Sequence, residues 1–329
     1  MTDEKSDEMK VHFYKFLLQI LFNVGCVFNL SSQQLKTLSK NEVTSLYNQL
    51  YKSSDIDSII WKGNIQKCIC GQLEDDIYIK AENRINFFRI VSGLSKVRLN
   101  SKFNLDAQNA ALLVKANNEL THHPAREMKC YNQSAANGCL KSCLAFTDYK
   151  NFRETSFITG FIQDFGNSNY FVGHRKWILY TKLIEFGYGA TDKSEALLTA
   201  DGVSNDSLAA PEFIAYPWSG YVPVDLIFPK WSFSIPQNKV ADFSQTTISM
   251  FDSGGKELKT EKLKEYKNYL DHTIVWTARG LFTEYDITYG LNKLEQNGFL
   301  DKKIKVLIRN VKIDGSVRQY EYFVEPIRL

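Results

Sequence analysis

The spacing of apolar residues along this chain changes near residue 172, from the repeat of a helix to the repeat of a strand. Before that point, residues 81–94 place apolar side chains three or four positions apart, as one face of a helix requires. Beyond Pro229, short apolar segments alternate with turn signals such as Asp314-Gly315. Helices followed by runs of strands predict an α+β chain, in which the two kinds of element are segregated.

Two further helices are predicted before the change. Asp106 is an N-cap candidate for a helix that ends near Leu120, and residues 155–164 form the third helix. Because a proline cannot continue a helix, Pro124 places His122 just beyond the end of the second one.

Strands are predicted where side chains alternate in polarity, first at 177–188 and then throughout a β-rich stretch at 229–329. Residues 191–212, which are rich in Ser, Ala, Asp and Gly, are predicted as a loop. The Lys- and Glu-rich segment 258–270 is either helical or a long loop. The predicted strands of the β-rich stretch are 246–251, 273–276, 304–309 and 319–326.

Charge and composition narrow the class of protein. The 40 basic and 37 acidic residues leave a net charge of +3, and no block of Lys or Arg stands out. Binding of nucleic acid requires a concentrated basic face, so we expect no nucleic-acid partner. With 44% hydrophobic residues, the chain can bury a substantial core.

The first 28 residues resemble a secretory leader. Residues 1–8 are acidic, but from Met9 the chain has a basic start followed by an apolar run at 16–28. That run is too short for a membrane span, which needs about 20 apolar residues. We therefore expect a signal peptide beginning at Met9, a secreted protein and no membrane span; the alternative is an amphipathic helix packed on the domain.

The cysteines cluster in two places. Cys130, Cys139 and Cys143 lie close together, and a Cys-x-Cys pair occupies residues 68–70. In an oxidising compartment this clustering favours disulfides, most simply Cys130 with Cys139 or Cys143. A zinc site is the rival interpretation, but Cys-x-Cys lacks the spacing of a zinc knuckle.

An ordered set of short motifs resembles the CAP superfamily, which comprises cysteine-rich secretory proteins, antigen 5 and pathogenesis-related proteins and is defined by the SCP domain. The variant around His174 is closer to the bacterial branch, in which a β-rich tail follows the domain. The motifs are at residues 83–89, 120–122, 173–180, 187–189 and 217–223.

The resemblance implies an α-β-α sandwich with a central, largely antiparallel sheet and a cleft. A small all-β, sandwich-like domain is expected to follow it. The implied organisation is a leader at 1–28, a lead-in at 29–80, a CAP domain at 81–228 and a β-rich domain at 229–329.

The same resemblance implies which residues line the cleft. In the best-known members these are two histidines and two acidic residues. His122 and His174 match the histidines, and Asp164 falls at the position of the second acid. Ser142 stands where the first acid is expected.

Chemically, His122 and His174 could hold a zinc ion through neutral ring nitrogens, although no cofactor is required. A catalytic zinc usually has three protein ligands, and Asp164 is the only further candidate here. The simpler alternative is that His122 caps the preceding helix while His174 hydrogen-bonds within the cleft. Ser142 lacks the Gly-x-Ser-x-Gly context of a nucleophile.

The function implied is non-catalytic extracellular binding of a lipid- or sterol-like molecule, or of a partner protein, through the His-lined cleft. Two alternatives remain. One is a metal-dependent hydrolase that uses His122, His174 and Asp164. The other is a structural or signalling surface protein with a vestigial cleft.

Overall fold

The computed structural model describes residues 37–147, 155–206, 209–266 and 269–329. The described residues form one compact unit. The expected leader at 1–28 lies outside the described residues. The helices are α2 (Lys40–Leu46), α3 (Asp75–Val91), α4 (Ser101–Asn117), α5 (Gln133–Lys141), α6 (Thr155–Gln163), α7 (Gly173–Ile178) and α8 (Glu284–Tyr289).

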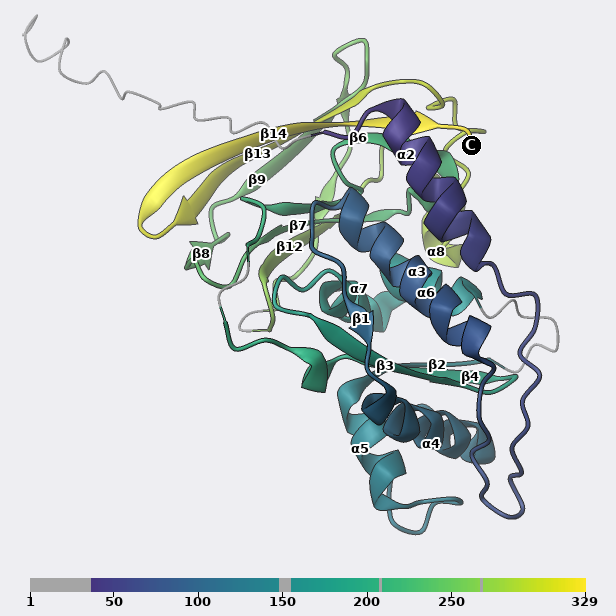
Figure 1. Ribbon diagram of the computed structural model, residues 1–329. Helices are drawn as coiled ribbons and strands as arrows, with labels where there is room; N and C mark the ends of the chain where they lie inside the picture. Colours follow the sequence, from purple (N-terminus) through teal and green to yellow (C-terminus); the bar gives the residue numbers. More distant parts are fainter. Residues whose placement is uncertain (1–36, 148–154, 207–208, 267–268) are drawn as a thin grey trace, which may run out of the picture. The chain divides into compact units, whose positions relative to one another are not determined.

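A four-stranded sheet lies between two layers of helices. Its order is β1-β3-β4-β2, with β1 parallel to β3 and the other pairs antiparallel. Helices α4 and α5 cover one face, and α3, α6 and α7 lie on the other side (Figure 1). The strands are β1 (Arg98–Leu99), β2 (Ser142–Phe146), β3 (Glu185–Ala190) and β4 (Ser194–Leu198).

Strand β3 explains how the layers approach so closely. Its glycines face α4, where a Cβ on Gly189 would lie 2.2 Å from the backbone nitrogen of Gln108. Phe186 and Tyr188 alternate with these glycines and point into the main hydrophobic core. The absence of side chains on one face therefore lets the α4 backbone pack directly on the sheet.

The C-terminal region is β-rich and contains two further sheets. One has the order β10-β9-β13-β14-β6, with β8 also paired to β13, and the other has the order β11-β12-β7-β5. The strands are β5 (Ile214–Tyr216), β6 (Gly220–Pro223), β7 (Lys230–Ile235), β8 (Ala241–Asp242), β9 (Thr247–Phe251), β10 (Glu257–Leu258), β11 (Glu261–Lys262), β12 (His272–Thr277), β13 (Ile304–Ile313) and β14 (Ser316–Ile327).

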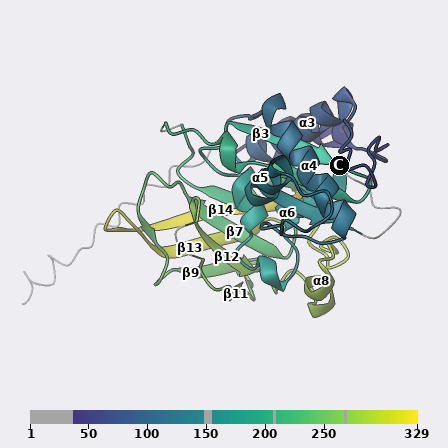
Figure 2. The ribbon, with the colours of Figure 1, turned by 90° about the horizontal axis from the view of Figure 1, so that it is seen from below.

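Large buried side chains join these two sheets. The rings of Phe233 on β7 and Tyr320 on β14 lie 5.0 Å apart. Trp276 on β12 donates its indole N–H to the sulfur of Met250 on β9 at 3.3 Å. Figure 2 shows β7 and β12 running alongside β13 and β14.

The mixed helix and strand class and the β-rich C-terminal region are confirmed. The boundary at residue 228 stays a prediction. Strands β5 and β6 precede it in the sequence, yet β5 pairs with β7 and β6 pairs with β14. Both C-terminal sheets therefore take a strand from the region assigned to the CAP domain.

Three local predictions were wrong. Helix α4 begins at Ser101, where the side chain of Asn100 accepts the N–H of Lys102, so Asp106 lies inside the helix. Residues 177 and 178 belong to α7, because contacts with α6 fix a short helix there. The segment 191–212 contains β4, whose polar residues Ser194 and Glu195 are fully buried.

The predicted disulfide was also wrong. Cys130 pairs with Cys68, 62 positions earlier in the sequence. Cys139 and Cys143 are free and buried, and they belong to different hydrophobic clusters: Cys139 packs with α4, and Cys143 packs in the main core. Their proximity in sequence does not bring them to the same face of the sheet.

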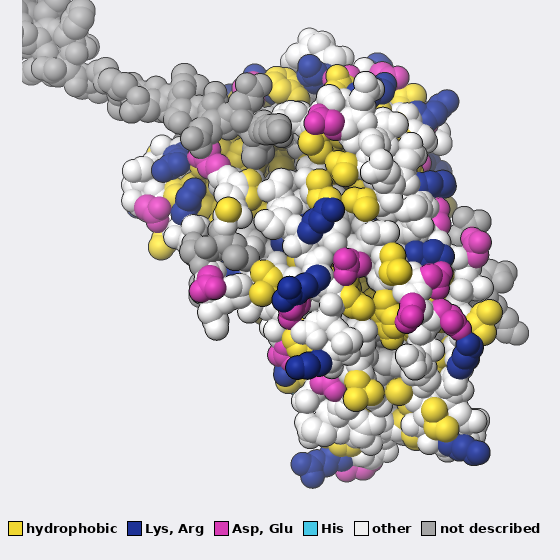
Figure 3. Space-filling model, viewed as in Figure 1, with side chains coloured by type: hydrophobic (Ala, Val, Ile, Leu, Met, Phe, Trp, Pro, Cys, Tyr) yellow, Lys and Arg dark blue, Asp and Glu magenta, His cyan; other side chains and the backbone are white. Residues whose placement is uncertain are grey.

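Surface charges of opposite sign are interspersed. On the face shown in Figure 3, Lys and Arg side chains alternate with Asp and Glu side chains. Several of them pair between elements, such as Arg98 with Glu185 at 2.7 Å and Lys141 with Asp201 at 2.9 Å. Exposed pairs of this kind contribute little stability individually, about 0–1 kcal/mol each.

Candidate functional site at helix α7

The carboxylate of Asp164 anchors the start of α7. Asp164 directly follows α6, with a left-handed backbone (φ 54°), and its side chain is fully buried. One oxygen accepts the ring Nδ1–H of His174 at 2.8 Å. The other accepts the backbone N–H groups of His174 at 2.9 Å and Arg175 at 3.3 Å. Asp164 thereby fixes both the helix start and the orientation of the histidine ring.

This geometry selects one tautomer of His174. A carboxylate only accepts hydrogen bonds, so Nδ1 carries the proton and Nε2 of the neutral ring keeps its lone pair. The side chain is 25% exposed, and its ring lies 5.0 Å from that of Phe161. His174 therefore offers one nitrogen acceptor on a ring that is held in place.

Two cations, the buried Arg175 and the half-buried Lys230, join this segment to strand β7. The guanidinium of Arg175 donates to the carbonyl oxygens of Ile162 at 2.6 Å and Gln163 at 3.2 Å, and to Ser232 Oγ at 3.1 Å. Lys230 on β7 donates to the carbonyl oxygen of Asp164 at 2.6 Å. Burial lowers the pKa of Arg175 to about 10 and that of Lys230 to about 8.

Lys230 also holds the loop after α6. Its ammonium donates to the carbonyl oxygens of Gly166 at 2.7 Å and Asn169 at 3.0 Å. One side chain thus satisfies three backbone acceptors between α6 and α7, which keeps the Asp164–His174 pair in register with the C-terminal sheet.

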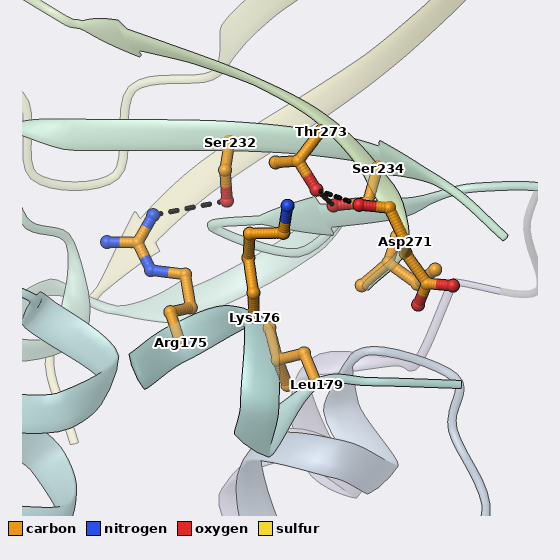
Figure 4. Close-up of a pocket in the computed structure, with 8 residues that line it drawn as sticks. Arg175, Lys176, Leu179, Ser232, Ser234, Asp271 and Thr273 are labelled. Carbon is orange, nitrogen blue, oxygen red and sulfur yellow. Dashed lines mark hydrogen bonds between the residues drawn. The ribbon is translucent and has the colours of Figure 1, made fainter. Parts of the chain in front are cut away.

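A small polar cavity lies between α7 and the four-stranded C-terminal sheet (Figure 4). The amine of Lys176 points towards Ser232 and Thr273 of β7 and β12. The volume of the cavity is about 10 Å³, which is room for about one water molecule. Burial lowers the pKa of Lys176 to about 8, although the charge of Asp271 opposes this shift.

Aromatic side chains gather beside α7. Phe171 stacks on Tyr266 with ring centroids 4.6 Å apart, and Tyr266 is 48% exposed. Phe171 packs against Gly173, where a Cβ would lie only 2.6 Å from its ring. We call this group the α7 aromatic cluster; its members are Tyr170, Phe171, Trp177, Tyr266 and Tyr269.

Two further ionisable side chains, both thiols, are buried on opposite sides of the central sheet. Burial, together with the negative charges of Asp164 and Glu195, raises the pKa of the Cys143 thiol well above its usual value. Burial also raises the pKa of Cys139, on α5, to about 12. Both thiols therefore stay protonated, which makes them poor nucleophiles and poor metal ligands.

The structure brings Asp164 and His174 together and gives the other two candidates different surroundings. His122 is exposed, and its Nδ1 donates to the carbonyl oxygen of Cys139 in α5 at 2.7 Å, so it does not cap α4. Ser142 pairs with Leu198, which packs against α4. Helix α5 lies across the sheet from α6 and α7 (Figure 1).

Among the described residues, no three His, Cys, Asp or Glu side chains are placed to hold a metal ion. Two ligands, His122 and His174, were expected, and their hydrogen bonds go to different elements. Zinc binding by this pair, and the cleft that they would share, stay predictions.

Sequence reasoning missed Arg175, Lys176, Lys230 and Glu195. Arg175 and Lys176 are neighbours in sequence, and both side chains are buried, at 1% and 7% exposed. Glu195 is a second buried carboxylate, and it lies in a segment that was predicted as a loop. The only sequence feature that could have indicated these residues is a charged residue in an otherwise apolar segment.

Comparison with known proteins gives a family match over part of the chain. Residues 82–197 match the family model for the cysteine-rich secretory protein family, CAP, so this part of the chain is similar to that family. No curated protein matches the chain. No helix in the described ranges is long and apolar enough to cross a membrane.

A crystal structure at 1.5 Å resolution, of an extracellular protein containing a SCP domain from Bacillus anthracis strain Ames, is similar to part of this chain. The identity is 17% and the TM-score is 0.28. The match covers 40% of this chain and 44% of that protein, which is less than half the length of either.

Proposed function

We propose that the protein is secreted and binds a lipid- or sterol-like ligand, without turning it over, at the α7 aromatic cluster beside His174. The observation that carries this proposal is the cluster itself, in which Tyr266 is 48% exposed over the ring of Phe171. Grouped, partly exposed aromatic rings suit apolar or amphipathic ligands. The free Nε2 of His174 supplies one polar contact for a hydroxyl group.

Two observations support binding rather than catalysis. The buried thiols of Cys139 and Cys143 stay protonated. Ser142 lies on the α4 side of the sheet, whereas the Asp164–His174 pair lies on the α6–α7 side. None of these three side chains is therefore placed to act as a nucleophile beside the Asp164–His174 pair, as covalent catalysis there would require.

Secretion is supported by the Cys68–Cys130 disulfide, since structural disulfides persist in oxidising compartments. The matching family is also described as secretory. Sequencing the N-terminus of exported protein tests this part: a mature start after residue 28 is expected, and a retained Met1 or Met9 would contradict it.

Ligand binding is tested with a fluorescent sterol, dehydroergosterol, by energy transfer from Trp177. Replacing Tyr266 by Ser should weaken binding about two- to tenfold, because an aromatic contact contributes about 0.5–1.5 kcal/mol. The matched control is Tyr285→Ser on α8. Tyr285 is 59% exposed and its ring lies 4.5 Å from that of Tyr289, but it is outside the cluster. The control should bind like the wild type.

Three results would contradict the proposal. They are no sterol binding by the wild type, an equal loss in both variants, or hydrolysis of cholesteryl acetate detected by mass spectrometry. If the wild type binds no lipid but retains a partner protein through Tyr266, the ligand class is wrong and the surface assignment is right.

A further inference from the structure

A second hollow lies on the outer face of the six-stranded sheet, where β9, β13 and β14 run side by side (Figure 1). Along β13, Ile304, Val306 and Ile308 are fully buried, so the residues between them face outward. The hollow has a volume of about 500 Å³. Pockets for small molecules typically have about 300–1,000 Å³, so a single small ligand fits.

The hollow combines an apolar floor with a basic rim. Leu307 is 5% exposed, and Phe323 on β14 is 38% exposed. We call this hollow the β13 groove; the residues that define it are Phe251, Leu307, Phe323, Lys303, Lys305 and Arg309.

The basic side chains of the groove are only partly neutralised. Lys305 pairs with Glu321 at 2.8 Å, and both side chains are 37% exposed. Lys303 lies 5.4 Å above the ring of Phe323 and 4.0 Å from the carboxylate of Glu325. Arg309 is exposed and has no ion pair within the described ranges.

The lining carboxylate belongs to Asp252, and its charge is used locally. It accepts the backbone N–H groups of Gly254 and Lys256, each at 2.9 Å, and so holds the turn between β9 and β10. The groove is therefore basic above an apolar floor, a combination that complements an anion with an apolar body.

Regular pairing with β9 places Arg309 at this site, and a β-bulge follows it. The pairing of β13 with β14 shifts between Ile308 and Val311, and Asn310 has a left-handed backbone (φ 60°). Arg309 still pairs with Thr247 of β9, in line with the outward residues Lys305 and Leu307. Bulges of this kind aim side chains at functional sites, and here the bulge ends the outward row at Arg309.

We propose that the β13 groove binds a small organic anion with an aromatic or aliphatic body. The body would lie on Leu307, Phe251 and Phe323, and its carboxylate or sulfonate would pair with Lys305 and Arg309. An inorganic anion would leave the apolar floor unused, and a neutral apolar molecule would leave the cations unused. This site is separate from the α7 aromatic cluster.

The test uses two fluorescent naphthalene probes that differ in charge. The anionic probe is 1-anilinonaphthalene-8-sulfonate, and the neutral probe is N-phenyl-1-naphthylamine. Replacing Lys305 and Arg309 by Ser should weaken the sulfonate at least about tenfold and leave the neutral probe within about twofold, because only the sulfonate pairs with the cations. The matched control removes two exposed lysines elsewhere, Lys67 and Lys96.

Removing the ion-pair partner of Lys305 should have the opposite effect and raise the affinity for the sulfonate. Glu321→Gln removes the competing carboxylate, so the sulfonate should bind about threefold more tightly, and added salt should reduce the gain. Phe323→Ser should weaken both probes, because both use the apolar floor. Tyr266→Ser should change neither, which separates this site from the proposed sterol site.

Three outcomes would overturn the proposal: equal sulfonate binding by the wild type and the Lys305/Arg309 variant, an equal loss in the Lys67/Lys96 control, or no tightening in Glu321→Gln. A fourth outcome concerns competition for the bound fluorescent sulfonate. If an acidic, Phe-containing peptide displaces it at lower concentration than naphthalene-sulfonate does, the groove binds a protein segment and a small-molecule ligand is excluded. Far-UV circular dichroism verifies that each variant is folded.

Discussion

At the scale of single residues, Asp164 performs three tasks with its carboxylate and its backbone carbonyl oxygen. It accepts the ring proton of His174 and the first backbone N–H groups of α7, while its own carbonyl oxygen receives Lys230. Hydrogen bonds to a charged acceptor contribute about 1.5–3 kcal/mol each. The ring orientation and the position of α7 therefore depend on the same side chain.

Replacing Asp164 by Asn should change the tautomer of His174. The amide NH₂ group would face Nδ1 while the amide oxygen keeps the backbone N–H groups, so the ring proton would move to Nε2. Nitrogen-15 NMR of the neutral ring measures this directly. The free energy of unfolding should fall by about 1–3 kcal/mol.

Asp201→Asn is the control for this experiment, because Asp201 forms only an exposed pair with Lys141. That change should cost less than about 1 kcal/mol and leave the His174 spectrum unaltered. An Nε2-bound proton in the wild type, or an unchanged tautomer in Asp164→Asn, would refute the role assigned to Asp164.

Sequence reasoning paired Asp164 with His174 through the family resemblance, and the structure joins them. It could not find Lys230, because the acceptors of Lys230 are backbone carbonyl groups that no side-chain pattern displays. Ser142 and Cys143 show a second limit. They are neighbours in sequence but face opposite sides of β2, so only the strand assignment decides which one approaches Asp164.

At the scale of elements, α7 shows why a short helix escapes prediction. It has six residues, which are too few for a repeat of apolar positions to be recognised. Its start is fixed by Asp164, which directly follows α6. The alternation of Trp177 and Leu179 is equally compatible with a strand. In contrast, α3 and β14 are long and regular, and both were recognised. The helix predicted at 81–94 overlaps α3, which begins at Asp75, and the strand predicted at 319–326 lies within β14.

The packing of α7 on the C-terminal sheet makes stability depend on pH through Lys176. Its folded pKa of about 8 lies below the unfolded value, so burial of the charged amine destabilises the fold below pH 8. The penalty disappears as the amine deprotonates between about pH 8 and pH 10. Relative to Lys176→Met, the wild type should therefore gain about 2 kcal/mol of unfolding free energy over that range.

Urea unfolding at pH 7 and pH 10 measures this difference. Lys96→Met, which removes an exposed lysine, is the control and should show no such gain relative to the wild type. A difference between wild type and Lys176→Met that is constant with pH, or that falls as pH rises, would show that Lys176 is solvated.

At the scale of the whole molecule, strands late in the sequence pair with strands from earlier in the sequence to complete the C-terminal sheets. Strand β6 joins the last strand, β14, in a parallel pair, and β5 joins β7. The pairing of β6 with β14 connects segments that are far apart in the sequence, so local periodicity could not predict it. The change from helical to β-rich structure was predicted near residue 172, but helix α7 begins at Gly173 and strand β2 precedes that point. The disulfide shows the same limit: spacing favoured Cys139 or Cys143, whereas the fold brings Cys68 to Cys130.

The disulfide should contribute substantially to global stability, because it closes a long loop. For a separation of 62 residues, the loss of chain entropy in the unfolded state corresponds to about 4 kcal/mol. Replacing both Cys68 and Cys130 by Ser should lower the unfolding free energy by about this amount and abolish its sensitivity to dithiothreitol. Cys139→Ala distinguishes the Cys68–Cys130 bond from a bond between Cys130 and Cys139. It should keep the full response to dithiothreitol, and a variant that lost that response would instead support the bond between Cys130 and Cys139.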